Sequence, residues 1–205
     1  MTIISIRHGA DDGLLRVELS DGSLFSFKTC YLPLVFDTTE GIEINEAEEK
    51  GLRFASACLR AEKAALRLIA RAEQTTLGLR RKLEKRGHDS ACIRGVISQL
   101  CETGLLDDRR YARLWLDARV SRQRTSPRRL LIALSARGID RDDTASALKE
   151  ALDDEVEFLL LKRYMEKLQR KRKISSDDGD DSHSLKYQLK SEGFSSLAIQ
   201  RFLAE

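Results

Sequence analysis

The most restrictive feature of the sequence is a pattern of two leucines and a glycine, each four residues apart, that occurs three times. The copies are Leu79, Leu83 and Gly87; Leu130, Leu134 and Gly138; and Leu185, Leu189 and Gly193. Leucines four residues apart lie on one face of a helix, and a glycine is typical of the left-handed residue that follows a helix end. Self-similarity of this kind indicates a repeat architecture.

The register continues into a second helix after each glycine. Apolar or small residues stand six and ten positions further on: Ile93, Thr144 and Ile199, then Ile97, Leu148 and Leu203. The predicted N-caps of these second helices are Asp89, Asp140 and Ser195. A further helix is expected before each pair, at about 61–73, 107–122 and 154–173. The pattern therefore predicts three tandem units of three helices.

The first part of the chain has a different period. Alternating apolar residues and two Asp-Gly turns, Asp12-Gly13 and Asp21-Gly22, predict a three-stranded meander. A two-residue turn at Asp21-Gly22 would place Phe25 opposite Glu18 and Phe27 opposite Arg16. Such a register requires a bulge or a covering partner for the aromatic face.

The fold class expected is mainly α, with a small β-meander before the repeats. The predicted segments are the meander at 1–38, a connecting helical segment at 39–58, and three-helix repeats at 59–106, 107–153 and 154–205, the last with an acidic insert at 175–184. In the connecting segment, Asn45 and Glu48 form a predicted capping box, and Gly51 is expected to interrupt or end the helix. Because about 50 residues bury too little apolar surface for a good core, the units should lean on one another in an elongated, curved array.

Charge is distributed unevenly along the chain. Residues 1–58 carry a net charge of −5 and residues 59–106 carry +5. Two basic clusters are the candidate contact residues for an acidic surface or for phosphate. The first basic cluster is Arg80, Arg81, Lys82, Lys85 and Arg86, and the second basic cluster is Arg119, Arg122, Arg124, Arg128 and Arg129. We expect them to occupy similar places in their repeats and to line up on one face; a solubilising outer face is the alternative.

Motifs for catalysis, cofactors or metals are not found in the sequence, so an enzyme, a small-molecule substrate and a bound cofactor are not expected. The four cysteines, Cys30, Cys58, Cys92 and Cys101, are expected to be buried thiols. An acidic run at Asp177, Asp178, Asp180 and Asp181 lacks full calcium-loop spacing and is expected to be a solvated loop. Tyr111 and Trp115 are expected to be core rather than a base-stacking platform. No apolar run is long enough to cross a membrane, and a cytoplasmic location is expected.

The run from Leu100 to Asp140, LCETGLLDDRRYARLWLDARVSRQRTSPRRLLIALSARGID, resembles the RecX family of bacterial recombinase regulators. Its markers are Gly104-Leu105-Leu106-Asp107-Asp108, then Tyr111-Ala112, Arg119 and Pro127. The chain departs from the family pattern at Ser126, where members often have glycine, and at Gly78 and Ala133, where they often have glutamate.

The resemblance implies tandem three-helix repeats and binding to the RecA recombinase filament on DNA, with restraint of its ATPase and strand-exchange activities. Single- and double-stranded DNA would be bound weakly and without sequence preference, and neither a membrane nor a small-molecule substrate would be involved. Two alternatives remain open from the residues alone: a sequence-specific DNA-binding regulator of the helix-turn-helix kind, and a helical-repeat protein scaffold without a nucleic-acid partner.

Overall fold

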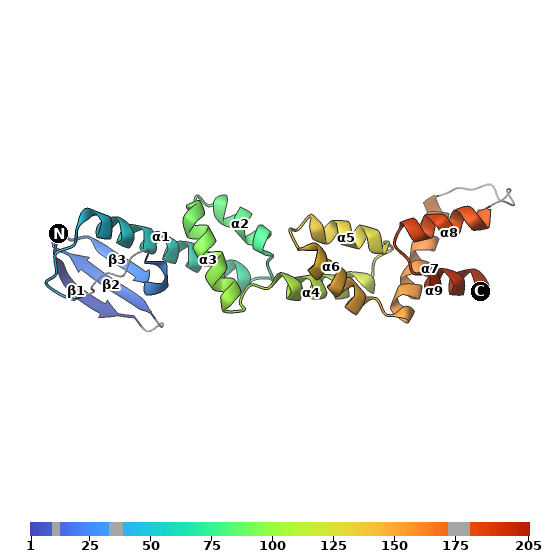
Figure 1. Cartoon of the computed structure of the whole chain (residues 1–205), viewed down its shortest axis with the longest axis horizontal. Helices are drawn as coiled ribbons and strands as arrows, with labels where there is room; N and C mark the ends of the chain where they lie inside the picture. Colours follow the sequence, from blue (N-terminus) through green and yellow to red (C-terminus); the bar gives the residue numbers. More distant parts are fainter. Residues whose placement is uncertain (10–12, 33–38, 172–180) are drawn as a thin grey trace. The chain divides into compact units, whose positions relative to one another are not determined.

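The computed structural model describes residues 1–9, 13–32, 39–171 and 181–205 (Figure 1), and for residues 171 and 181–183 it describes the backbone alone. Residues 175–180 of the acidic insert therefore lie outside the described residues, and residues 181–184 form the start of a helix. The chain forms two compact units, Met1–Leu106 and Asp107–Glu205. The fold is mainly helical with a small N-terminal sheet, as predicted.

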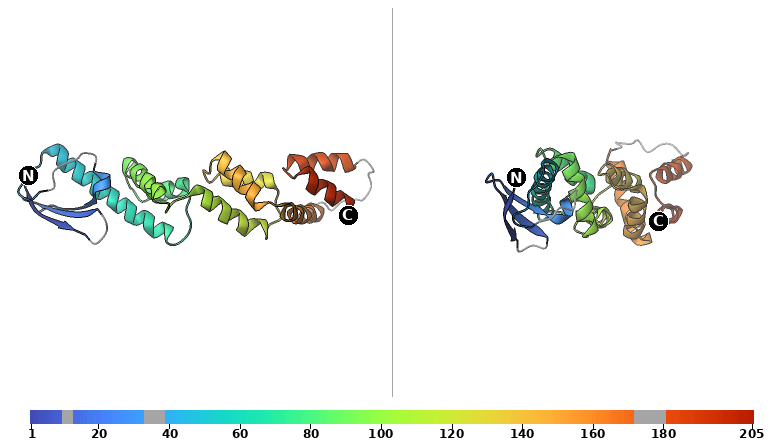
Figure 2. Two further views of the ribbon diagram at one scale, coloured as in Figure 1. Left: turned by 60° about the horizontal axis from the view of Figure 1, so that its bottom comes forward. Right: turned by 60° about the vertical axis from the view of Figure 1, so that its left-hand side comes forward.

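The first unit begins with the predicted meander. Strands β1 (Ile3–His8), β2 (Leu14–Leu19) and β3 (Leu24–Lys28) form an antiparallel sheet in the order β1-β2-β3. A short 3₁₀ turn, η1 (Thr29–Tyr31), follows the third strand. Helices α1 (Glu46–Ile69), α2 (Thr76–Glu84) and α3 (Ser90–Glu102) complete the unit. The first part of α1 lies over the sheet, and its later part lies beside α2 and α3 (Figures 1 and 2).

The second hairpin does not adopt the register that a two-residue turn would impose. Phe25 pairs with Val17 and Phe27 pairs with Leu15. The loop holds three residues, 20–22, because the N–H of Leu19 donates to the Ser23 carbonyl at 2.9 Å and Gly22 takes a φ of +81°. A three-residue loop with a left-handed final residue is a common hairpin connection. It places both phenylalanines on the same face as the β2 core residues, with the extra residue, Gly22, in the turn and the β2–β3 ladder itself regular.

Helix α1 is longer than the sequence pattern predicted. Asn45 and Glu48 form the expected capping box, but Gly51 is buried inside the helix and does not end it. The boundary predicted between residues 58 and 59 therefore falls inside a continuous helix. A glycine costs a helix about 1 kcal/mol relative to alanine, and the fully buried Leu52 and Ala55 on the same stripe offset that cost.

One hydrophobic core runs through the whole first unit. It contains Val17 and Phe27 from the sheet, Leu52 from α1, Leu83 from α2 and Ile93 from α3. The salt bridge between Lys28 Nζ and the buried carboxylate of Glu62, 2.6 Å long, adds a polar tie between β3 and α1. The sheet and the three helices thus fold as one body.

The second unit contains the other two repeats. Its helices are α4 (Asp108–Val120), α5 (Pro127–Ser135), α6 (Arg141–Ala151), α7 (Asp154–Lys171), α8 (Asp181–Ser191) and α9 (Ser196–Ala204). They share one core, in which Leu116, Leu134, Leu160 and Ile199 are buried. The rings of Tyr164 and Phe194 lie 5.5 Å apart in that core.

The helix ends of the three repeats follow the predicted pattern. Gly87, Gly138 and Gly193 have φ values of +77°, +83° and +87°. In each copy the residue after the glycine donates its N–H to the second leucine of the pattern, as His88 does to Leu83 at 3.3 Å. The predicted caps Asp89, Asp140 and Ser195 each accept a backbone N–H of the next helix.

Three sequence expectations about burial differ from the structure. Leu203 is 37% exposed, and Phe202 packs against the core in its place. Cys58 and Cys92 are buried as expected, but Cys30 and Cys101 are exposed, because Cys30 lies in the η1 turn and Cys101 lies on the outer face of α3.

In the described part of the chain, no helix combines the length and apolar character needed to cross a membrane.

Candidate binding surfaces

The first basic cluster lies on the outer face of α2 and the turn that follows it. All five side chains are exposed, while Leu79 and Leu83 turn the opposite face into the core. Lys82 is anchored, because its Nζ donates to Oε1 of the buried Gln74 at 2.6 Å. Neither a hydrogen bond nor an ion pair joins the other four side chains to any described residue. Four cations are therefore free to meet an anion.

The second basic cluster is more heavily engaged within its own unit. The guanidinium of Arg119 lies 4.0 Å from the ring centre of Trp115. Arg124 forms an ion pair with Glu166 at 3.3 Å, and Arg128 donates from Nη1 to the carbonyl of Ser191 at 3.4 Å. Arg122 and Arg129 are exposed. Arg119 thus packs within α4, Arg124 joins the α4–α5 loop to α7, and Arg128 joins α5 to the end of α8.

The two clusters do not occupy equivalent places, contrary to expectation. If the repeats are aligned on Gly87 and Gly138, the α5 positions that match Arg80, Arg81 and Lys82 hold Leu131, Ile132 and Ala133. Arg128 and Arg129 instead stand in the first turn of α5. The first basic cluster covers the C-terminal half of α2 and the turn after it, whereas the second surrounds the start of α5.

Trp115 belongs to the core, as expected, and it is 9% exposed. Two guanidinium groups lie over its ring, that of Arg119 at 4.0 Å and that of Arg137 at 4.7 Å from the ring centre. Tyr111 packs against the same core and is partly buried. A buried indole in contact with two arginines of its own chain is not an exposed stacking platform for a nucleic-acid base.

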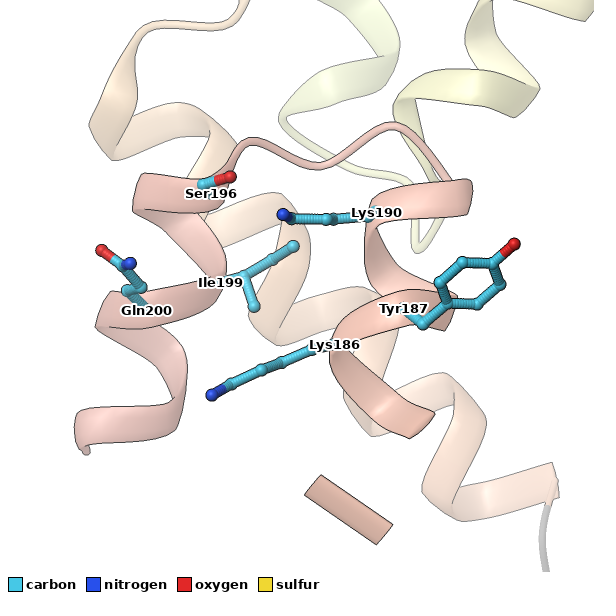
Figure 3. A pocket seen from close by; sticks show the side chains of 6 residues that line it. All are labelled: Lys186, Tyr187, Lys190, Ser196, Ile199 and Gln200. Carbon is cyan, nitrogen blue, oxygen red and sulfur yellow. The ribbon is translucent and has the colours of Figure 1, made fainter. Parts of the chain in front are cut away.

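A basic hollow that the sequence reasoning missed lies between α8 and α9 (Figure 3). It has a volume of about 270 Å³ and is lined by Lys186, Tyr187, Lys190, Ser196, Ile199 and Gln200. The two lysines, one helical turn apart, extend from α8 towards α9, whereas the 75%-exposed Tyr187 points away from it. The signal in the sequence is the Lys186 and Lys190 pair, each one residue after a leucine of the third repeat.

The amines, guanidinium groups and hydroxyls that these surfaces present are suited to binding anions. The part of the chain that the structure describes contains no group of histidine, cysteine and carboxylate side chains that could hold a metal ion. Burial raises the pKa of the Cys58 and Cys92 thiols, so both stay protonated near neutral pH and neither is an activated nucleophile.

Comparisons with known proteins agree with this architecture. The family model described as "RecX, second three-helix domain" matches residues 107–148. The Regulatory protein RecX of Treponema pallidum is 36% identical over 151 residues, which cover 74% of this chain and 88% of that protein. The chain belongs to the RecX family. A second RecX, from Halorhodospira halophila, is 40% identical over 97 residues, covering 47% of this chain and 57% of that protein.

Solved RecX structures show the same fold. A crystal structure of regulatory protein RecX matches with a TM-score of 0.74 at 21% identity, covering 100% of this chain and 99% of that one. The crystal structure of RecX from Lactobacillus salivarius matches with a TM-score of 0.60 at 22% identity, covering 73% and 96%. The RecX relatives are named as regulatory proteins, so the chain is a member of a family of regulators.

Proposed function

We propose that this chain is a non-enzymatic regulator that binds the RecA recombinase filament on DNA and restrains its ATPase and strand-exchange activities, thereby modulating recombination and DNA repair. The observation that carries the proposal is membership of the RecX family over most of the chain. Four unpaired cations of the first basic cluster supply a surface for the acidic recombinase or for phosphate. On this proposal DNA alone is bound weakly and without sequence preference.

Within this proposal, the contact residues are Arg80, Arg81, Lys85 and Arg86, supported by Arg122 and Arg129. Lys82, Arg119, Arg124 and Arg128 have a structural task as well, because each is held by a partner in its own unit. Their loss would change both folding and binding. The unpaired residues are therefore the ones to test.

The helix-turn-helix alternative is less well supported. In a groove-reading motif the second helix presents base-reading side chains to DNA. The second helix of repeat two, α6, begins with Asp142 and Asp143 in its first turn and carries the exposed Glu150 near its end. These carboxylates would face the negative groove. A plain protein scaffold is the remaining alternative.

The deciding experiment is a titration of this protein into the DNA-dependent ATPase assay of the recombinase from the same organism. We expect inhibition at substoichiometric ratios. The variant with Arg80, Arg81 and Lys85 changed to Glu should need at least about ten times more protein for the same inhibition, which corresponds to about 1.4 kcal/mol. The matched control changes three exposed cations outside both clusters, Arg113, Arg141 and Lys149, to Glu.

Inhibition that is equal in both triple variants would remove the first basic cluster from the proposal. Full ATPase activity in the presence of saturating, folded protein would exclude the filament role itself. A preference for one duplex sequence by more than about 10³ over random DNA would favour the sequence-specific alternative.

A further inference from the structure

The two edges of the N-terminal sheet differ in whether another described segment covers them. The β1 edge is covered by residues 41–44, since the Ile3 N–H donates to the Ile42 carbonyl at 3.0 Å and the Ile44 N–H donates to the Met1 carbonyl at 2.7 Å. The β3 edge has no such cover among the described residues. The Ser23 carbonyl accepts from the Leu19 N–H, and the Thr29 N–H donates to the Gly13 carbonyl, so the main chain of β3 hydrogen-bonds to the β2 side at odd-numbered residues. Because these bonds alternate along an antiparallel strand, the N–H and C=O groups of Leu24 and Ser26 point outward. An unpaired strand edge is a template for another strand.

Two hollows lie on either side of this open edge, and Leu24, Phe25 and Ser26 line both of them. The hollow on the helix side has a volume of about 400 Å³ and continues onto α1. The hollow on the open face of the sheet has a volume of about 410 Å³ and continues onto β1 and β2. Because successive side chains of a strand point to opposite faces, a strand added at β3 would send its side chains alternately into the two hollows.

The helix-side hollow is basic above an apolar floor. Its floor is formed by Leu59 and Phe25, which are 4% and 8% exposed. Its rim is formed by Arg53, Arg60 and Lys63 of α1. Arg60 and Lys63 form no ion pair with a described residue, whereas Arg53 shares the carboxylate of Glu49.

A buried hydroxyl also lines the helix-side hollow. The residue Ser56 is 8% exposed, and its Oγ has no hydrogen-bond partner in the part of the chain that the structure describes. A buried polar atom without a hydrogen-bond partner destabilises the folded state. A hydrogen-bonding group entering the hollow would remove that destabilisation.

The open-face hollow is basic as well. Arg7 and Arg16 are exposed and stand directly opposite each other in the β1–β2 register. Like charges directly opposite in a sheet repel one another, and a carboxylate placed between them would relieve that repulsion. The single acid of this hollow, Glu18, accepts a hydrogen bond from Ser5 Oγ at 3.2 Å.

We propose that the open edge of β3 binds an extended acidic peptide segment of a partner protein as a fourth strand, with acidic side chains entering both hollows. The main chain of the segment bonds to Leu24 and Ser26, and its carboxylates face Arg60 and Lys63 on one side and Arg7 and Arg16 on the other. This proposal does not depend on the proposed filament role. A nucleic-acid strand lacks the ladder of amide donors and acceptors, and a second copy of this chain would bring like charges together.

The first test uses a seven-residue probe, acetyl-Val-Glu-Glu-Val-Glu-Glu-Val-amide with a fluorophore, which places glutamates on both faces of a strand. Fluorescence anisotropy should show saturable binding by the full chain, and the same peptide with lysine for glutamate should not bind. Amide hydrogen exchange gives the readout specific to strand addition. On saturation the exchange of the Leu24 and Ser26 amides should slow at least about tenfold, which corresponds to 90% occupancy of a protected state.

The second test uses variants. Ser26→Pro removes the outward N–H without removing a bond to β2, a place where an edge strand tolerates proline. We expect it to weaken peptide binding at least about tenfold, as should Arg60→Glu with Lys63→Glu. The matched control is Arg67→Glu with Arg71→Glu, further along the chain from the hollow, with binding unchanged and folding of every variant checked by thermal unfolding.

Several outcomes would overturn the proposal. They are unchanged exchange of the Leu24 and Ser26 amides at saturation, equal binding by the Arg60 and Lys63 variant and its control, or displacement of the peptide by single-stranded DNA of equal charge at equal concentration. If Ser26→Pro does not fold, the exchange measurement and the charge variants still decide the matter.

Discussion

At the scale of single residues, Ser126 shows how a side chain that looks like a cap can serve another purpose. It is the N-cap residue of α5 and precedes Pro127, but its hydroxyl makes no capping bond to α5. The hydroxyl is fully buried and donates to the carboxylate of Glu192, and the Arg128 N–H donates to the carbonyl of Glu192 at 3.0 Å. The start of α5 is thus fixed by the turn between α8 and α9. A sequence pattern cannot reveal a partner so far along the chain.

Ser126→Ala should therefore destabilise the protein by about 1–3 kcal/mol, because it leaves a partly buried carboxylate without its donor. Urea unfolding measures the change. Ser121→Ala, at an exposed position after α4, is the matched control and should change the free energy of unfolding by less than about 0.5 kcal/mol. Equal stability of the two variants would mean that the Ser126 bond contributes nothing.

The titratable residues of the first core predict a loss of stability at alkaline pH. Burial raises the pKa of the Tyr31 hydroxyl and of the Cys58 and Cys92 thiols. The folded state therefore holds these protons more tightly than the unfolded state does. These neutral groups contribute fully to the free energy of unfolding below their unfolded pKa values, about 8.5 for a thiol and 10 for a tyrosine. As the pH rises above those values, that contribution to stability is lost.

Urea unfolding of the full chain between pH 7.5 and 10.5 measures this loss. The variant with Cys58 and Cys92 changed to alanine should be less stable at neutral pH but should lose less stability as the pH rises. If parent and variant lose stability with the same dependence on pH, the buried thiols are not its source.

At the scale of elements, the sequence predicted the helices of the repeats better than their surfaces. The leucine and glycine spacing predicted the caps because both are local in sequence. The hairpin register differs from that of a two-residue turn because Ser20-Asp21-Gly22 forms a longer loop than the Asp-Gly dipeptide suggested. The ten candidate cations are exposed or partly buried, but the ion pair between Arg124 and Glu166 joins the α4–α5 loop to α7, far along the chain. Only the folded structure separates the unpaired cations from the anchored ones.

Two glycine substitutions, one at a helix end and one inside a helix, should change stability in opposite directions. Gly138 has a φ of +83°, where a β-branched side chain is strained, so Gly138→Val should destabilise by roughly 1–2 kcal/mol or more. Gly95 lies inside α3, and a Cβ there would meet only Tyr31 Cδ1 at 4.0 Å, so Gly95→Ala should stabilise by about 0.5–1 kcal/mol. Thermal unfolding distinguishes them, and a shift in the same direction for both would contradict this account of the caps.

At the scale of the whole molecule, each compact unit has its own hydrophobic core. The first joins the sheet to α1, α2 and α3, and the second joins repeats two and three. The sequence placed a boundary at residue 106 from the repeat period alone. It could not show that the meander shares a core with the first repeat, because that core is assembled from residues distant in sequence.

The fragments 1–106 and 107–205 should each fold when produced separately. Circular dichroism should show helical spectra and cooperative thermal unfolding for both fragments, because each core is built from residues of its own unit. Leu83→Ala, which opens a cavity in the first core, should lower the free energy of unfolding of fragment 1–106 by about 2–5 kcal/mol. A fragment that shows no cooperative transition would contradict the division at Leu106.

Helix α1 has 24 residues and therefore a length of about 36 Å, and it carries the sheet at one end and packs beside α2 at the other. The open β3 edge and the first basic cluster consequently belong to one body, because the sheet, α1 and α2 share a hydrophobic core. A partner that engages both surfaces loses its rotational and translational freedom only once. Two contacts that are each weak would then act through effective concentration, and their combined avidity could exceed either affinity by about 10²–10⁴.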